Sequence, residues 1–314
     1  MEILVTGGGG FVGKHLVDEL SASGENRVIV LDNFSTSVES DFYYLKSRPN
    51  IELIRWDVTI PYSFDCELIF NLACPASPIQ YQKNPVETSR TNFLGTMHAL
   101  ELARKNNAVM VQASTSEVYG DPKFSPQKES YWGNVNPIGI RSCYDEGKRV
   151  AETLCFDFYR EYKTKIKVAR IFNTYGPGMA FDDGRVVSNF IVQAIRNMDI
   201  SIYGKGEQTR SFCYVTDTVS ALISLALTPS EITGPVNIGN HNEITISKLG
   251  EEIISLTKSK SLITYHQLPE DDPVQRKPDI SLASKVLGWY PKIDLGVGLG
   301  LTFSDFANRM KVRM

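Results

Sequence analysis

Short apolar segments alternate with longer amphipathic ones through the first part of the chain. Each apolar segment has the length of a strand and is rich in aliphatic residues, which is typical of strands buried on both faces. We predict strands at residues 3–5, 28–31, 51–54, 68–72, 109–113 and 166–171, with helices between them. This order favours an α/β fold in which a doubly wound parallel sheet carries helices on both faces.

The pattern changes after residue 171, where turn-forming residues are concentrated at 173–178 and 182–184. We predict a helix at 186–196, a strand at 200–203, a helix at 214–227, a strand at 236–239 and a turn at 271–273. We therefore expect a sheet domain of residues 1–171 with a returning segment at about 212–240. Residues 172–211 and 241–314 would form a smaller C-terminal α/β lobe. Such a lobe would bind substrate by capping the carboxyl ends of the strands.

An apolar stripe runs along the helix predicted at residues 144–162, with Ala151, Leu154, Phe158 and Tyr162 at helical spacing. Packing against the sheet explains this stripe without any ligand. The same face, joined by a helix at 94–100, could equally form half of a helix bundle between two subunits. We therefore expect a homodimer and leave both explanations of the stripe open.

A glycine-rich turn connects the first strand to the first helix. Residues 6–13 (TGGGGFVG) place Gly7, Gly10 and Gly13 at the spacing G-x-x-G-x-x-G, and Gly8 adds the spacing G-x-G-x-x-G. A strand, a tight turn and a helix in this order let a bare backbone approach a diphosphate at the helix N-terminus. The turn therefore predicts a Rossmann-type dinucleotide site.

Asp32 indicates which dinucleotide the site takes. It ends the second strand, nineteen residues after Gly13. A carboxylate at this point accepts hydrogen bonds from two ribose hydroxyls and repels a 2′-phosphate. We therefore expect NAD as the cofactor and not NADP.

Composition excludes several classes of function. The hydrophobic content of 42% and charged content of 22% are ordinary for a globular protein. The net charge of −3 gives no basic surface for nucleic acid, and no apolar run approaches the roughly 20 residues needed to span a bilayer. The first strand begins at residue 2, which leaves no room for a signal peptide. We expect a cytoplasmic protein that binds neither nucleic acid nor a membrane.

Cysteine and histidine usage agrees with that expectation. The five cysteines are odd in number and form no C-x-x-C pair, which is typical of reduced thiols. The four histidines are scattered without the spacing of metal ligands. We expect no metal site.

Two polar segments carry candidate chemistry. Residues 114–120 (STSEVYG) follow the strand at 109–113, and Tyr144 precedes Lys148 by four residues. That spacing places both side chains on one face of a helix. A lysine ammonium favours the phenolate of a neighbouring tyrosine, whose pKa is otherwise near 10. Alone, the spacing is typical of a solvated helix face. Beside a dinucleotide site, it predicts proton transfer at an alcohol carbon.

Longer motifs resemble the extended short-chain dehydrogenases/reductases that act on nucleotide sugars. They are residues 6–13, 32–34 (DNF), 170–177 (RIFNTYGP) and the pair Tyr144 and Lys148. Within that family the chain is similar to the UDP-glucuronate decarboxylases, or UDP-xylose synthases, at 73–78 (ACPASP), 114–122 (STSEVYGDP), 131–139 (YWGNVNPIG), 143–152 (CYDEGKRVAE), 183–190 (DGRVVSNF) and 271–280 (DDPVQRKPDI). It departs from their pattern at Cys74, Arg90 and Ile140, where serine, lysine and proline are usual.

The resemblance implies NAD-dependent oxidation at C4 of UDP-glucuronate, loss of carbon dioxide from the 4-keto sugar, and reduction back to UDP-xylose. In this scheme Tyr144 exchanges the O4 proton, Lys148 holds its charge and the nicotinamide ribose, and Thr115 helps to stabilise the enolate oxygen. Glu117 would orient the sugar and position a water or proton at C5. The ordinary alternative for Thr115 and Glu117 is capping of the strand end.

The resemblance also implies the binding residues. Cofactor contacts are expected from Gly7, Gly10, Phe11, Val12, Gly13, Asp32, Asn33, Asp57, Val58, Leu72, Ala73, Thr91, Tyr144 and Lys148. Contacts with the UDP-sugar are expected from Arg90, Ser116, Asn173, Val187, Ser188, Tyr203, Gln208, Arg210 and Arg276. Arg210 and Arg276 are the candidates for the diphosphate, since a guanidinium binds phosphate bidentately.

Three other functions remain open. A dTDP-glucose 4,6-dehydratase would carry an aspartic acid beside the glutamate as proton donor, where this chain has Ser116. A sugar 4-epimerase fits the segments at 114–117 and 131–139 less well. A non-catalytic NAD-binding regulator would be favoured by loss of Thr115, Tyr144 or Lys148, and all three are present.

Overall fold

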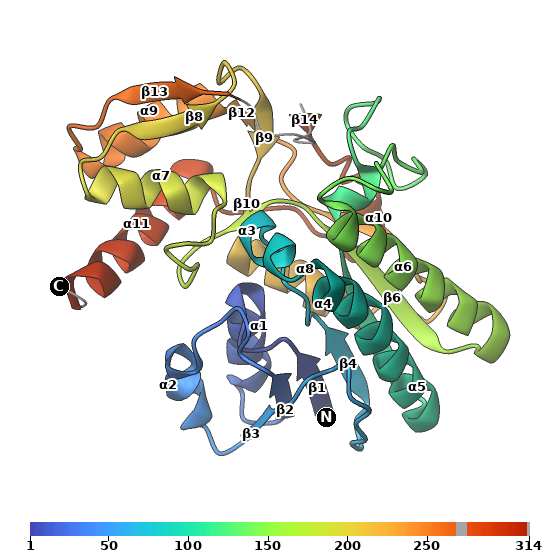
Figure 1. The fold of residues 1–314 in the computed structure, drawn as a ribbon. Coiled ribbons are helices and arrows are strands. Elements are labelled where there is room, and N and C mark those ends of the chain that lie inside the picture. The colour runs from blue at the N-terminus through green and yellow to red at the C-terminus, as the bar shows by residue number, and fades with distance from the viewer. Residues whose placement is uncertain (268–274, 313–314) are drawn as a thin grey trace.

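The computed structural model describes residues 1–267 and 275–312. Its centre is a seven-stranded sheet in the order β11-β6-β5-β4-β1-β2-β3, with every neighbouring pair parallel (Figure 1). The strands are β1 (Glu2–Thr6), β2 (Arg27–Asp32), β3 (Ile51–Arg55), β4 (Leu68–Asn71), β5 (Val109–Thr115), β6 (Lys165–Ile171) and β11 (Val236–Ile238). All seven were predicted from apolar segments, and the doubly wound fold is confirmed. The turn predicted at 271–273 lies outside the described residues.

Helices cover both faces of the sheet because successive strand residues point to opposite sides. Ile3 and Val5 pack on the face covered by α1 (Phe11–Ser21) and α8 (Val215–Ala226). Leu4 packs on the other face, against α5 (Thr96–Asn106) and α6 (Ser142–Tyr162). The strand order reverses between β1 and β4, which is the topological switch point where ligands bind in such sheets.

Smaller elements form a lobe above the carboxyl ends of the strands (Figure 1). In it β8 (Ile200–Tyr203) pairs with β13 (Ile263–His266), and β9 (Thr209–Ser211) lies between β12 (Glu243–Thr245) and β14 (Gln275–Arg276). The helices α7 (Val186–Ile195), α9 (Ile246–Thr257) and α11 (Leu295–Val312) cover these strands. The pair β7 (Thr174–Tyr175) and β10 (Cys213–Tyr214) connects the lobe to the sheet.

We propose the domain boundary expected from the sequence, at residue 171 with a return at about 212–240. In support, β11 belongs to the large sheet and α8 packs on it, whereas the segments before and after them supply the lobe. One helix of the last segment, α10 (Ser281–Leu287), packs on α8 and β11 instead.

The apolar stripe of α6 faces the core of its own subunit. Ala151 is fully buried and Phe158 is 8% exposed, whereas Tyr162 at the end of the helix is 46% exposed. Packing against the sheet therefore explains most of the stripe. Apolar side chains remain exposed on the preceding elements, at Val86 in α4 (Pro85–Arg90) and at Phe93 in the π-helical turn Thr91–Gly95.

Among residues 1–267 and 275–312, no helix combines the length and apolarity needed to cross a membrane. The same part of the chain contains no cluster of three or more metal-ligating side chains. All five cysteines are free thiols.

Candidate active site

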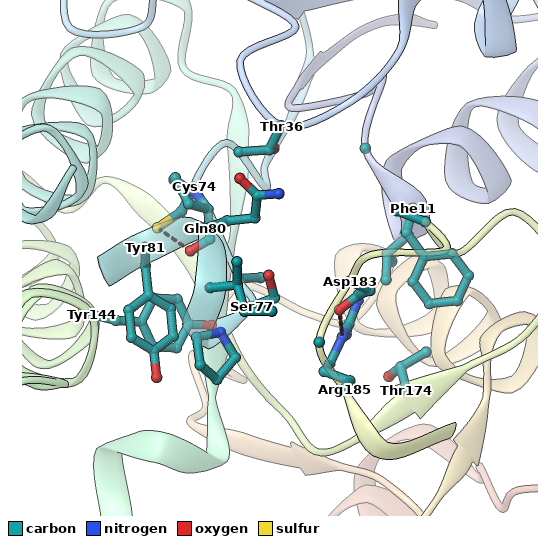
Figure 2. Close-up of a pocket in the computed structure, with 18 of the residues that line it drawn as sticks. Phe11, Thr36, Cys74, Ser77, Gln80, Tyr81, Tyr144, Thr174, Asp183 and Arg185 are labelled. Carbon is teal, nitrogen blue, oxygen red and sulfur yellow. Dashed lines mark hydrogen bonds and ion pairs between the residues drawn. The ribbon is translucent and has the colours of Figure 1, made fainter. Parts of the chain in front are cut away.

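A cavity of about 1120 Å³ opens between the carboxyl ends of the strands and the lobe (Figure 2). Most of the predicted site residues line it, although they come from distant parts of the chain. The predicted residues lining the cavity are Gly7, Gly10, Phe11, Val12, Gly13, Asp32, Asn33, Asp57, Val58, Leu72, Ala73, Thr91, Thr115, Ser116, Glu117, Tyr144, Lys148, Asn173, Val187, Tyr203, Gln208, Arg210 and Arg276.

Glycine is required where the turn after β1 meets neighbouring backbone. Gly7 has a φ of +70°, and a Cβ there would lie 2.7 Å from the backbone of Ala73. A Cβ on Gly13 would lie 2.2 Å from the carbonyl oxygen of Gly7. No side chain caps the N-terminus of α1, so its first N–H groups remain available to a ligand. The turn is therefore a fit for an anionic diphosphate.

Asp32 lies beside this turn at the end of β2. Its carboxylate accepts hydrogen bonds from the backbone N–H groups of Gly9 at 2.9 Å and Phe34 at 2.8 Å. Burial raises the pKa of Asp32 above its usual value, and these two hydrogen bonds oppose the rise. Further along the cavity, burial opposes ionisation of Asp57, but hydrogen bonds from Thr59 and Asn33 outweigh it and lower the pKa of Asp57. The two carboxylates fit the hydroxyl and amino groups of an adenosine.

Cofactor selectivity gives the first prediction. We expect NAD to bind at least about tenfold more tightly than NADP, or about 1.4 kcal/mol, because Asp32 would repel a 2′-phosphate. Replacing Asp32 with asparagine should reduce that ratio, since it removes the charge but keeps the side-chain shape. Asp18→Asn is the matched control, because Asp18 pairs with Arg48 outside the cavity. Titration of cofactor-free protein measures both affinities, and equal affinities in the unmodified protein would contradict the assignment.

Tyr144 lies in the wall of the cavity, packed against a second tyrosine. Its ring stacks on that of Tyr81, with centroids 4.9 Å apart and planes 6° apart (Figure 2). Burial raises the pKa of Tyr144 well above its usual range, and the Thr115 side chain opposes that rise. The phenol is therefore neutral in the protein alone.

In the protein alone, Lys148 does not overcome the effect of burial on Tyr144, and its role in favouring the phenolate stays a prediction. The Lys148 ammonium donates a hydrogen bond to the carbonyl oxygen of Ala113 at 2.9 Å. It lies 5.8 Å from the centre of the Tyr144 ring and does not offset the burial of the phenol. Helical spacing placed both residues on one face, as predicted, but the carbonyl at the end of β5 holds the ammonium.

Glu117 is held by two arginines. Its carboxylate pairs with Arg141 at 2.8 Å and makes two short contacts with Arg276. Burial disfavours the charged form, but the Arg276 and Arg141 charges outweigh burial and lower the pKa of Glu117. The Thr115 hydroxyl also accepts a hydrogen bond from the Glu117 backbone at 3.2 Å. Thr115 thus caps the 3₁₀ helix at Ser116–Tyr119, which follows the strand.

The two arginines expected at the diphosphate lie side by side. Arg276 in β14 is directly opposite Arg210 in β9, and both side chains are at least nine-tenths buried. Gln208 extends the same edge of the cavity and donates a hydrogen bond to the carbonyl oxygen of Tyr203 at 2.6 Å. This edge presents the positive charge that a nucleoside diphosphate requires.

Two predicted substrate residues are not in the cavity wall. Arg90 in α4 is half exposed and lies 3.5 Å from Glu87 one turn earlier, and its charge helps to lower the pKa of Asp57 in the cavity wall. Ser188 is fully buried and donates its hydroxyl to the carbonyl oxygen of Arg185 at 2.9 Å. Neither residue lines the cavity. Their roles in substrate binding stay predictions.

Other residues of the cavity were missed. Arg141 precedes Tyr144 by one helical turn, a spacing that could have indicated it. Arg185 pairs bidentately with Asp183 at 2.5 and 2.6 Å and lies on the opposite side of the cavity from Tyr144 (Figure 2). Arg185 lies within the motif at 183–190, but neither it nor Tyr81 was predicted as a site residue. Behind the cavity wall, burial and the Glu117 charge raise the pKa of Asp145.

Comparison with known proteins agrees with this geometry. Residues 3–239 match the model of the NAD dependent epimerase/dehydratase family. The chain is 54% identical over 312 residues to UDP-glucuronic acid decarboxylase 6 of Arabidopsis thaliana, covering 99% of this chain and 90% of that protein. It is 48% identical to UDP-glucuronic acid decarboxylase 1 of Danio rerio, covering 98% and 73%.

Solved structures share the fold. The UDP-glucose 4-epimerase of Thermotoga maritima, solved with UDP-glucose, has a TM-score of 0.88 at 28% identity, covering 99% of this chain and all of that one. The dTDP-glucose 4,6-dehydratase of Bacillus anthracis, solved with NAD, has a TM-score of 0.86 at 24% identity, covering 99% and 98%. The motifs that resembled extended short-chain dehydrogenases/reductases are thereby confirmed, and the chain belongs to the NAD dependent epimerase/dehydratase family.

Proposed function

We propose that this protein is an NAD-dependent UDP-glucuronate decarboxylase that produces UDP-xylose. The observation that carries the proposal is the group of Thr115, Glu117 and Tyr144 in one cavity, with a hydroxyl at Ser116 where a dehydratase needs an acid. Identity of 48–54% to two decarboxylases over nearly the whole chain supports it.

The residues around Tyr144 can handle the proton at O4 of the sugar. Bound at the glycine turn, NAD would supply a hydride acceptor for C4 and return the hydride at the end of the cycle. Tyr144 accepts the O4 proton, and Thr115, which opposes the effect of burial on the pKa of the phenol, lines the same cavity. Lys148, fixed to the Ala113 carbonyl, adds positive charge on the same side. Because the phenol is neutral in the protein alone, the Lys148 charge, the cofactor and the substrate must together favour its ionisation during the reaction.

A carbonyl at C4 makes the sugar a β-keto acid. The bond from C5 to the carboxylate then breaks with its electrons flowing into that carbonyl, and carbon dioxide leaves. Tyr144, now protonated, and the Thr115 hydroxyl can donate to the oxygen where negative charge develops. Glu117 is an ionised acceptor because of its arginine partners, so we assign it to orienting the sugar and a water that protonates C5.

The alternative reactions fit this site less well. Elimination of water by a 4,6-dehydratase needs an acid next to C6, and the Ser116 hydroxyl cannot readily replace one. Glu117 does not supply that acid, since its pKa is lowered. Epimerisation needs a rotated 4-keto sugar, and the described residues give no observation that favours it.

Parallel incubations test the proposal. Purified protein with NAD should convert UDP-glucuronate into UDP-xylose and carbon dioxide, while dTDP-glucose should give no 4-keto-6-deoxy product. Nuclear magnetic resonance of the sugar products distinguishes these outcomes. Dehydration of dTDP-glucose without decarboxylation of UDP-glucuronate would refute the proposal.

We also propose a cytoplasmic homodimer. The exposed apolar side chains of Val86, Phe93 and Tyr162, at 69%, 41% and 46% exposure, lie on α4, the π-helical turn and α6 and would be covered by a helix bundle. Five free thiols suit a reducing compartment. Light scattering should give twice the chain mass of 35.1 kDa.

A further inference from the structure

Gln127 is a buried glutamine on the loop after β5, outside the cavity wall. It is 1% exposed, and it contacts the segment that carries Arg276. Its backbone N–H donates to the carbonyl oxygen of Lys277 at 2.8 Å, and its own carbonyl accepts from the N–H of Asp279 at 2.8 Å. Its side-chain oxygen accepts from the N–H of Lys277 at 2.8 Å. Three hydrogen bonds therefore join this one residue to the segment.

The other contacts of Gln127 fix it to the sheet domain. Its side-chain amide donates to the carbonyl oxygen of Phe124 at 2.7 Å. Asn237, fully buried in β11, donates to the Gln127 carbonyl at 2.9 Å. Gln127 thus joins a strand of the central sheet to the segment at 277–279.

Strand pairing alone gives the Arg276 segment little support. β14 has only two residues, Gln275 and Arg276, and pairs with β9 along one edge. Its continuation at Pro278 makes an isolated bridge with Gln127 on the other side. Figure 1 shows β14 between β9 and the green loop after β5. The hydrogen bonds between Gln127 and residues 277–279 therefore contribute much of what holds the Arg276 backbone in place.

We propose that Gln127 is a positioning residue that holds the Arg276 guanidinium against Glu117 and the substrate space. The proposal rests on the function proposed above. Gln127 does not line the cavity, so it acts through Arg276 and not on the substrate. A displacement of about 1 Å at such a group lowers catalysis by about 100-fold.

The test compares two substitutions of Gln127. Gln127→Met keeps the size of the side chain but leaves the Lys277 N–H and the Phe124 carbonyl without partners. It should lower kcat/KM for UDP-glucuronate by about 10- to 100-fold. Gln127→Glu keeps an acceptor for Lys277 and should recover most of that loss. Asn50→Ala is the matched control, because it likewise removes two hydrogen bonds between a side chain and the backbone, at a site outside the cavity.

Two further measurements separate positioning from general destabilisation. Hydrogen exchange in a peptide covering 275–280 should become faster in Gln127→Met and stay unchanged in Asn50→Ala. In an Arg276→Lys background, Gln127→Met should have much less effect on kcat/KM, since the contact it positions is already altered. Full activity of Gln127→Met, unchanged exchange, or equal effects in both backgrounds would overturn the proposal. Absence of decarboxylation in the unmodified protein would instead refute the proposed function, and the exchange measurement would still test the hold on Arg276.

Discussion

Replacing Tyr144 with phenylalanine should lower turnover of UDP-glucuronate by about 10²- to 10⁴-fold. In the proposed mechanism the phenol exchanges the O4 proton in both the oxidation and the final reduction, so its loss should slow two steps. The phenylalanine ring can still stack on Tyr81, and folding and NAD binding should survive. Steady-state rates and an NAD titration measure the two effects separately.

The same substitution should change the pH dependence. Because burial raises the pKa of Tyr144, the phenolate fraction grows as pH increases, and the rate of the unmodified enzyme should rise with it. That rise should be absent in Tyr144→Phe. Tyr159→Phe, on the same helix but outside the cavity wall, is the control and should keep normal turnover. Near-normal turnover of Tyr144→Phe would contradict the catalytic assignment. The spacing of Tyr144 and Lys148 would then be an ordinary feature of a helix surface.

Replacing Glu117 with glutamine should separate the chemical steps. If Glu117 works after the oxidation of C4, NADH absorbance should appear in a single turnover and persist, while UDP-xylose formation falls by about 100-fold. Absence of any NADH signal would place Glu117 in the first step. Glu2→Gln is the control, since the Glu2 carboxylate forms an exposed ion pair with Arg27.

Loss of the Glu117 charge should also affect stability and a neighbouring acid. Arg141 and Arg276 would lose a buried partner, which costs about 3 kcal/mol. The Glu117 charge raises the pKa of Asp145, so its removal should lower that pKa. Denaturant unfolding measures the first effect. An unfolding free energy unchanged from the unmodified protein would contradict the ion pairs.

The sheet was predictable because its strands are buried on both faces, which leaves apolar runs such as those of β1 and β4. The glycine turn was predictable for a steric reason, since the backbone contacts of Gly7 and Gly13 exclude a Cβ. Tyr144 and Lys148 share a helix, and their spacing alone placed them on one face. These features depend on residues that are close in sequence.

The features that local spacing did not predict are mostly contacts between distant residues. Glu117 and Arg276 form an ion pair although 159 positions separate them in the sequence. No local spacing predicts that pair. Lys148 was expected to act on Tyr144, but the Ala113 carbonyl lies closer to its ammonium. Arg90 and Ser188 were carried over by resemblance, and each contacts a residue three positions earlier and does not line the cavity.

The central claim is that one active site oxidises C4 of UDP-glucuronate, releases its carboxylate as carbon dioxide, and reduces C4 again. UDP-glucuronate with deuterium at C4 tests it directly. The account predicts UDP-xylose that keeps deuterium at C4, formed with catalytic NAD and no net NADH. UDP-xylose without that deuterium, or no UDP-xylose at all, would contradict the account.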